Sequence, residues 1–198
     1  TGPTAAGSCT SAASGAAAHL ARARASAAAL GFAWNEGAVR GALAPVGGPA
    51  PLRVRLTIAR TGAAEVTTGP LAPNPPEWHV TIAAERLDPD ARLLRHKTTE
   101  RALYDRTRAT LPADIDEVLF LNTRGEVCEV TITNIFADFG AGLVTPPLSS
   151  GCLPGILRAE LLASGAAREA VIRGSDLPRA RLFTGNALRG LIPARLEP

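Results

Sequence analysis

The sequence pattern changes once along the chain, and this change limits the folds that the chain can adopt. Residues 13–30 are rich in alanine and end at a glycine, a pattern that predicts a helix. After the proline- and glycine-rich residues 44–52, apolar and polar side chains alternate strictly over residues 53–58, which is typical of a half-buried strand. The sequence therefore predicts an α+β protein, with a small helical segment over residues 1–46 and a larger domain over residues 47–198.

The larger domain is expected to be rich in antiparallel strands, because its apolar segments are short and separated by turn residues. Val54, Leu56 and Ile58 share one face of its first strand, and the Thr61–Gly62 turn returns the chain through residues 65–68. Further strands are expected at residues 78–83, 117–121, 128–136, 170–172 and 181–184. Helices are expected at residues 36–43, at 98–108 with Thr98 or Thr99 as N-cap, and from 154–155 to about 162.

Composition and charge exclude several classes of function. The net charge is +3 and the arginines are spread along the whole chain, so nothing favours a nucleic-acid partner. No apolar run approaches the roughly 20 residues that a membrane helix needs. Cys9, Cys128 and Cys152 lack a metal-ligand spacing and the histidines form no H-x-x-x-H pair, so no metal site is predicted. Three scattered cysteines favour a reducing cytosol and no disulfide framework.

The first residues carry few structural signals. Residues 1–12 are mostly Thr, Gly, Ala and Ser with almost no large side chain, so a weakly docked segment is expected. The sequence contains no methionine, even at position 1. We therefore expect that the chain does not begin at its translational start.

Lys97 is the only lysine in 198 residues, although lysine and arginine together number 21. Arginine does not lose its proton near neutral pH, so it cannot act as an amine nucleophile or form a Schiff base, whereas lysine can. If any position of this chain performs amine chemistry, that position is Lys97. Codon usage that favours arginine is the alternative explanation of a single lysine.

Three other segments are candidates for a site. Glu129 lies on a predicted strand, either as an ordinary exposed glutamate or as a pocket carboxylate opposite a cation. The small residues of 148–155 open a helix, where free backbone N–H groups and the helix dipole favour a phosphate, although many such helices bind nothing. The turn at residues 184–187 offers either more donors or an ordinary β-turn.

Four short sequence blocks follow one another along the chain: His96–Thr99, Glu129-x-x-x-x-Asn134-Ile135-Phe136, TPPLSSGCLPGI at residues 145–156 and NALRGLIP at residues 186–193. In this order and spacing they resemble the class IV aminotransferase family, which uses pyridoxal phosphate (PLP) in the fold type IV arrangement. The blocks LSSGCLPG and NALRG are more similar to the aminodeoxychorismate lyase branch than to the transaminases. The similarity extends over about residues 19–196.

The resemblance implies a role for each candidate residue. Lys97 would hold PLP as a Schiff base, and Glu129 would face the pyridine nitrogen and keep it protonated. The backbone at Gly155 and Ile156, and at Asn186 and Ala187, would bind the phosphate. Asn134 would belong to the same cofactor site.

The resemblance also implies a reaction. An enzyme of the lyase branch eliminates pyruvate from 4-amino-4-deoxychorismate and leaves 4-aminobenzoate for folate synthesis, with the lysine as acid and base. Two alternatives remain open: an amino-acid aminotransferase, and a cofactor-poor relative that serves as a binding or interface module. A small-molecule amino substrate, a cytosolic location and a homodimer are expected with the enzyme.

The sequence departs from the family at the periphery of the cofactor. The sizeable N-terminal segment of family members is missing or degenerate, since only residues 1–18 precede the first family-like helix. Ala17 stands where members have an arginine that grips the phosphate, and Leu157 replaces a threonine. The tyrosine expected five residues after the lysine falls on Ala102, with Tyr104 as a possible substitute. PLP is therefore expected to bind, but weakly.

Overall fold

The computed structural model describes residues 12–198, which form two compact units. The first unit ends at Pro70, and the second runs from Leu71 to Pro198. Residues 1–11, for which the sequence predicts weak docking, lie outside the described residues, and so does Cys9.

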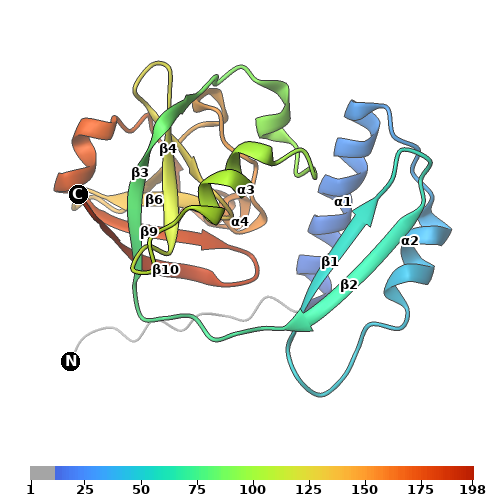
Figure 1. The fold of residues 1–198 in the computed structure, drawn as a ribbon. Coiled ribbons are helices and arrows are strands. Elements are labelled where there is room, and N and C mark those ends of the chain that lie inside the picture. Colours follow the sequence, from blue (N-terminus) through green and yellow to red (C-terminus); the bar gives the residue numbers. More distant parts are fainter. Residues whose placement is uncertain (1–11) are drawn as a thin grey trace. The chain divides into compact units, whose positions relative to one another are not determined.

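The first unit contains two helices and a hairpin (Figure 1). The predicted helices are present as α1 (Ala12–Leu30) and α2 (Glu36–Leu43). Asn35 is the N-cap of α2, because its side chain accepts the backbone N–H of Ala38 at 3.0 Å. Val39 of α2 is fully buried.

The hairpin consists of β1 (Leu52–Ile58) and β2 (Ala64–Pro70), which pair antiparallel along their whole length. The N–H of Ala33 donates to the carbonyl of Arg60 at 3.0 Å, and the Arg60 guanidinium lies 4.8 Å from the ring centre of Phe32. These contacts tie the hairpin to the connection between the two helices. The compact units therefore divide after Pro70, whereas the division predicted at residues 46 and 47 groups the hairpin with the second unit.

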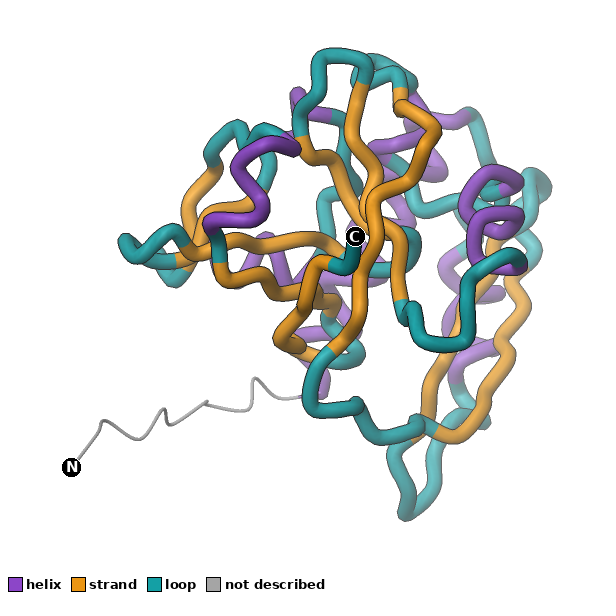
Figure 2. The backbone as a smooth tube through the Cα atoms, turned by 60° about the vertical axis from the view of Figure 1, so that its left-hand side comes forward, coloured by secondary structure: helices purple, strands orange, loops and turns teal. Residues whose placement is uncertain are grey.

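Eight strands of the second unit form one mixed sheet in the order β5-β4-β3-β10-β9-β6-β7-β8, shown in orange in Figure 2. The pairs β3–β4, β3–β10 and β7–β8 are parallel, and the other pairs are antiparallel. The strands are β3 (Trp78–Leu87), β4 (Glu117–Asn122), β5 (Val127–Val130), β6 (Asn134–Asp138), β7 (Leu143–Thr145), β8 (Ala167–Glu169), β9 (Arg181–Asn186) and β10 (Gly190–Leu196). The helices are α3 (Ala102–Ala109) and α4 (Ile156–Ala163), with the 3₁₀ turns η1 (Arg92–Arg95), η2 (Leu148–Ser150) and η3 (Gly174–Arg179).

The strand predicted over residues 128–136 is wrong as one element, because the structure divides it into β5 and β6. β5 pairs with β4 and β6 pairs with β9, so the chain changes partner at residues 131–133. Thr131 is held at this break, since its hydroxyl donates to the buried carboxylate of Glu117 at 2.8 Å. Both strands are buried. An apolar sequence pattern indicates burial but not the strand with which each segment pairs.

Two other boundaries also differ from the prediction. The helix expected from Thr98 begins at Ala102. Arg101 precedes it with non-helical backbone angles, φ −132° and ψ 21°, and its guanidinium donates to the carbonyl of Thr131. The strand expected at residues 170–172 lies at Ala167–Glu169, where it pairs in parallel with β7.

β4 is buried on both faces, and its side chains enter two apolar clusters. Leu119 and Leu121 join the main core of the sheet. Val118 and Phe120 point to the opposite face, where Leu103 and Tyr104 of α3 pack against them. Figure 1 shows α3 beside β4. This second face also receives Glu129, because Glu129 of β5 stands opposite Phe120 in the strand register.

A matched pair of phenylalanines tests the core. Phe136→Ala is expected to lower the free energy of unfolding by about 3–5 kcal/mol, because Phe136 is fully buried on β6. Phe139→Ala, three residues further on, should change it by less than about 1 kcal/mol, since that side chain is 43% exposed. Urea denaturation of both variants measures the difference. Equal losses would contradict the described packing of β6.

Candidate active site

Lys97 lies on the connection between η1 and α3, where it is exposed. The segment before it is fixed to the loop that precedes α4. Arg95 donates to the carbonyl of Leu148 at 3.1 Å. A β-carbon at Gly151, which has φ +92°, would lie only 2.8 Å from Cα of Pro89, so the close approach of the two segments requires glycine there. Lys97 is thereby positioned from the same loop that leads to the start of α4.

Glu129 is buried on β5, with 7% of its surface exposed. The Tyr104 hydroxyl donates to its Oε1 at 2.6 Å, and the backbone N–H of Leu153 donates to its Oε2 at 2.8 Å. Burial raises the pKa of Glu129, while these two hydrogen bonds and the charges of Arg101 and Lys97 act in the opposite direction. Lys97 is therefore near enough for its charge to act on Glu129. The pocket interpretation of Glu129 agrees with this burial, and the interpretation as an exposed strand residue does not.

Asn134 and Gly155 meet at the backbone carbonyl of Leu153. Asn134, the first residue of β6, donates from Nδ2 to the Leu153 carbonyl at 2.9 Å. A β-carbon at Gly155 would lie 1.9 Å from Oδ1 of Asn134, so this side chain leaves room only for glycine. The Leu153 backbone thus contacts Glu129 through its N–H and Asn134 through its carbonyl.

The start of α4 presents uncapped backbone donors. Gly155 is its N-cap and has no side chain to accept a first-turn N–H, beginning with that of Ile156. The positive end of the helix dipole adds to the attraction for an anion. A β-carbon at Gly185 would lie 2.8 Å from Cδ2 of Leu157, so the end of β9 packs closely on this first turn.

Asn186 shapes the turn between β9 and β10. Its Oδ1 accepts the backbone N–H groups of Leu188 and Arg189 at 3.0 Å each, and its Nδ2 donates to the Ile132 carbonyl at 3.2 Å. This contact attaches the turn to the break between β5 and β6. Ala187 is exposed in the same turn.

The structure thus connects the candidate residues in two ways. The Leu153 backbone links Glu129 with Asn134, and the Asn134 side chain packs against Gly155. Asn186 is bonded to the strand break, and Ile156 and Ala187 follow as chain neighbours. Lys97 joins them through the tethered loop and its charge on Glu129. Sequence reasoning missed the part played by Leu153, because a backbone donor leaves no signal in residue type.

A buried hydrogen-bond network fixes the loop before α4. The carboxylate of Glu126 accepts bonds from Asn122, Arg124 and the Ser150 hydroxyl at 2.9–3.0 Å. Asn122 also donates to the Ser150 carbonyl at 3.1 Å. The bonds from Arg124, Asn122 and Ser150 lower the pKa of Glu126 to about 2. An ionised carboxylate is therefore part of the support of this loop.

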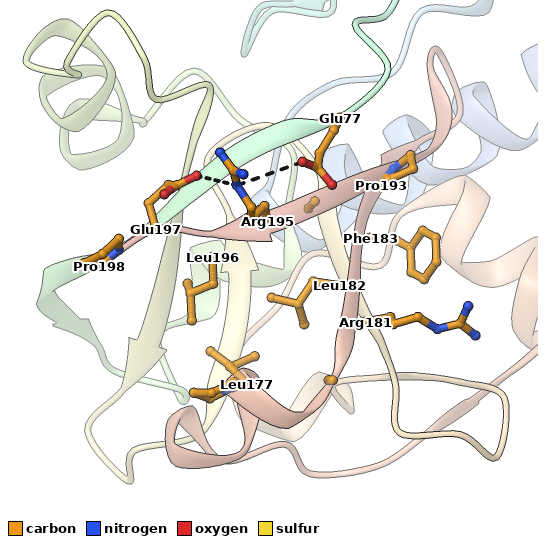
Figure 3. Close-up of a pocket in the computed structure, with 13 residues that line it drawn as sticks. Glu77, Leu177, Arg181, Leu182, Phe183, Pro193, Arg195, Leu196, Glu197 and Pro198 are labelled. Atoms are coloured by element: carbon orange, nitrogen blue, oxygen red, sulfur yellow. Dashed lines mark hydrogen bonds and ion pairs between the residues drawn. The ribbon is translucent and has the colours of Figure 1, made fainter.

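A separate open pocket of about 720 Å³ lies along β9 and β10 in the second unit (Figure 3). Leu177, Leu182 and Leu196 contribute apolar surface, and Arg195 pairs with Glu77 and Glu197 at its rim. It contains none of the candidate site residues.

Residues 12–198 contain neither a metal-binding cluster nor a membrane-spanning helix. No group of three or more His, Cys, Asp or Glu side chains is arranged to hold a metal ion there. None of the helices in that range is both long and apolar enough to cross a membrane.

The sequence matches the family described as amino-transferase class IV over residues 12–196. The chain belongs to this family. The resemblance seen in the four sequence blocks is thereby confirmed, and so is the α+β fold of type IV, which solved structures of the family share with the second unit and the helical segment before it.

Three relatives show how far the similarity extends. A Mesorhizobium loti protein, provisionally described as an amino-acid aminotransferase, is 47% identical with a TM-score of 0.86, and the match covers 92% of both chains. The 4-amino-4-deoxychorismate lyase of Pseudomonas aeruginosa shares the fold, with a TM-score of 0.74 at 23% identity over 92% of this chain and 77% of that one. The aminodeoxychorismate lyase of Saccharomyces cerevisiae is 31% identical over 128 residues, which are 55% of this chain and 33% of the yeast protein.

The Glu126 network predicts a pH dependence of stability. Glu126→Gln should lower the free energy of unfolding at pH 7 by about 1.5–3 kcal/mol, the contribution of a hydrogen bond to a charged group. A carboxyl with a depressed folded pKa stabilises the fold only while it is ionised. The difference between wild type and variant should therefore shrink as the pH falls from 4.5 towards about 2.

Urea denaturation at several pH values measures this difference. The same substitution at Glu85, which is exposed on β3, controls for the loss of one negative charge. A loss of stability that stayed constant down to pH 2 would mean that the Glu126 charge does not support the loop.

Proposed function

We propose that the chain is a PLP-dependent enzyme of the aminodeoxychorismate lyase type, which eliminates pyruvate from 4-amino-4-deoxychorismate and forms 4-aminobenzoate. The observation that supports the cofactor most strongly is the setting of Glu129. It is a buried carboxylate that accepts two hydrogen bonds from neutral donors and lies within reach of the Lys97 charge. The Leu153 backbone connects it to Asn134, whose side chain packs against Gly155 at the uncapped start of α4.

These residues suit the chemistry of PLP. The group has a basic ring nitrogen, an aldehyde and a phosphate, and when bound it accepts the electrons that a substrate carbon releases on losing a proton. Glu129 supplies a carboxylate for the ring nitrogen and Lys97 an amine for the aldehyde. Gly155 and Ile156 begin a helix suited to the phosphate, with the turn at Asn186 and Ala187 beside them.

The protein residues divide the proton transfers. Lys97, its amine freed when the amino group of the substrate takes its place, would accept the proton from the substrate carbon that bears this amino group, and would then supply one to the departing enolpyruvyl group. The carbon–oxygen bond between the substrate ring and that group would break, and the substrate ring would become aromatic. Glu129 holds the proton of the ring nitrogen throughout. Asn134 does not move protons but keeps the loop at Leu153 in place.

An aminotransferase is the second candidate, because the Mesorhizobium loti relative provisionally described in that way is 47% identical over nearly the whole chain. Support for the lyase comes from the two sequence blocks and the yeast relative. In a transaminase Lys97 would return the proton to the cofactor rather than to a leaving group. The homodimer and the cytosolic location belong to this proposal through family resemblance.

One assay tests the proposal. The chain, supplied with excess PLP because Ala17 replaces the phosphate-gripping arginine, should release pyruvate and 4-aminobenzoate in equal amounts from 4-amino-4-deoxychorismate. Borohydride should attach the cofactor to the peptide containing Lys97, the only lysine of the chain. Lys97→Ala should abolish both results, and Thr98→Ala serves as the matched control on the same connection.

Each other outcome has a defined meaning. Amino transfer to a 2-oxo acid without pyruvate release would favour the aminotransferase. Neither activity, with no adduct after borohydride, would favour the cofactor-poor relative. Adduct that persisted in Lys97→Ala would remove the lysine from its assigned role.

A further inference from the structure

We infer that Tyr104 is a positioning residue for Glu129. Its hydroxyl fixes one carboxylate oxygen and keeps the buried group ionised, so that Glu129 can hold a protonated ring nitrogen. This inference rests on the proposed function and deepens it. It assigns a role to a side chain two positions away from the place where the family resemblance expects a tyrosine.

The ring of Tyr104 is held from two sides. Phe120 of β4 meets it edge-on, with ring centres 5.3 Å apart and an interplanar angle of 77°. The guanidinium of Arg101 lies 4.8 Å from the ring centre. Arg101 is itself fixed, because it donates to the Thr131 carbonyl at the break between β5 and β6. The tyrosine is thereby held against β4 and, through Arg101, against the break between β5 and β6.

The late start of α3 makes this arrangement possible. Tyr104 is the third residue of the helix, and Arg101 stands just before it with non-helical backbone. A helix that began at Thr98 would carry Arg101 within its regular part. With the observed non-helical backbone, the Arg101 side chain reaches the Thr131 carbonyl and stacks on Tyr104.

The two hydrogen bonds fix the plane of the Glu129 carboxylate. Tyr104 occupies Oε1 at 2.6 Å and the Leu153 amide occupies Oε2 at 2.8 Å, so rotation of the group would break at least one of them. A carboxylate oxygen has two acceptor positions, so each oxygen keeps capacity for a further donor. The 2.6 Å distance is that of a charge-assisted O–H···O bond.

The charged and titratable groups around Glu129 come from every neighbouring element. Lys97 and Arg101 supply positive charge from the connection before α3. The thiols of Cys128 and Cys152 lie near enough to feel the Glu129 charge, and burial raises their pKa values to about 12 and about 11, so both stay neutral near pH 7. Burial also raises the pKa of Tyr104, which therefore remains a proton donor. Among these groups, Tyr104 and Leu153 are the ones that give Glu129 a hydrogen bond.

Removal of the Tyr104 hydroxyl should make Glu129 more basic. The pKa of this carboxyl is already raised by burial, and the bond from Tyr104 is the largest influence that lowers it. Without that bond Glu129 takes up a proton at higher pH. A protonated Glu129 carries no charge and therefore no longer stabilises the protonated ring nitrogen of PLP. Turnover should then fall first on the acidic side of its pH profile.

The test uses Tyr104→Phe, which keeps the ring contacts, and Thr107→Val as the matched control. Thr107 also lies on α3, but its hydroxyl donates to Leu103 within the helix at 2.9 Å. The pH titration of Glu129 is followed by NMR on the full chain without cofactor, with ¹³C-labelled glutamate and the resonance assigned by its loss in Glu129→Gln. Tyr104→Phe should raise the midpoint by roughly 1–2 pH units, and Thr107→Val should leave it unchanged.

A second readout uses the fact that Tyr104 is the only tyrosine of the chain. The tyrosine doublet in the ultraviolet Raman spectrum reports donation by the hydroxyl and therefore comes from this residue alone. Wild type should give the signature of a strong donor, and Glu129→Ala should lose it.

The outcomes separate this inference from the proposed function. An unchanged Glu129 midpoint in Tyr104→Phe, or an unchanged doublet in Glu129→Ala, would overturn the role of Tyr104. A shifted Glu129 midpoint in Tyr104→Phe, in a chain that neither binds PLP nor turns over substrate, would support the contact between Tyr104 and Glu129 but reject the proposed function. A shifted midpoint together with a displaced acidic limb of the rate profile supports both.

Discussion

The arrangement of the candidate site depends on the backbone of one residue, Leu153. Its N–H holds the carboxylate of Glu129 and its carbonyl is held by Asn134. Leu153 thereby joins Glu129 of β5, the start of β6 and the segment leading into α4, although β5 and β6 are not neighbours in the sheet. Gly155 is required next to it, because any β-carbon there would collide with Asn134. The acidic group and the uncapped start of α4 are therefore placed as one unit.

This arrangement offsets part of the cost of burying the carboxyl group of Glu129, whose pKa burial raises. Taking a charged group out of water is costly unless hydrogen bonds and nearby cations compensate. The Tyr104 hydroxyl and the Leu153 amide satisfy Glu129, and the charges of Lys97 and Arg101 reduce the cost further. The same pattern supports the loop before α4, where Asn122, Arg124 and Ser150 surround Glu126. Two buried acidic residues, Glu129 and Glu126, thus help to position the candidate site and the loop before α4 through their hydrogen bonds.

The sequence allowed the fold class, most element positions and the family to be predicted, because alternation, glycine turns and the ordered blocks are local signals. The break between β5 and β6 could not be predicted, since the apolar sequence pattern of a buried strand does not depend on the strand with which it pairs. The start of α3 at Ala102 depends on a long-range bond from Arg101 to Thr131. The role of the Leu153 backbone was invisible for the same reason. What local patterns lack is the identity of distant partners.

The central claim is that Glu129 serves as the partner of the PLP ring nitrogen while Lys97 holds the cofactor. It is tested most directly by ¹⁵N NMR of PLP labelled at the ring nitrogen and bound to the chain. The account predicts a protonated nitrogen in wild type and a largely unprotonated one in Glu129→Gln, since a neutral amide cannot stabilise the added charge. An unprotonated nitrogen in wild type, or the same protonated signal in both proteins, would contradict it.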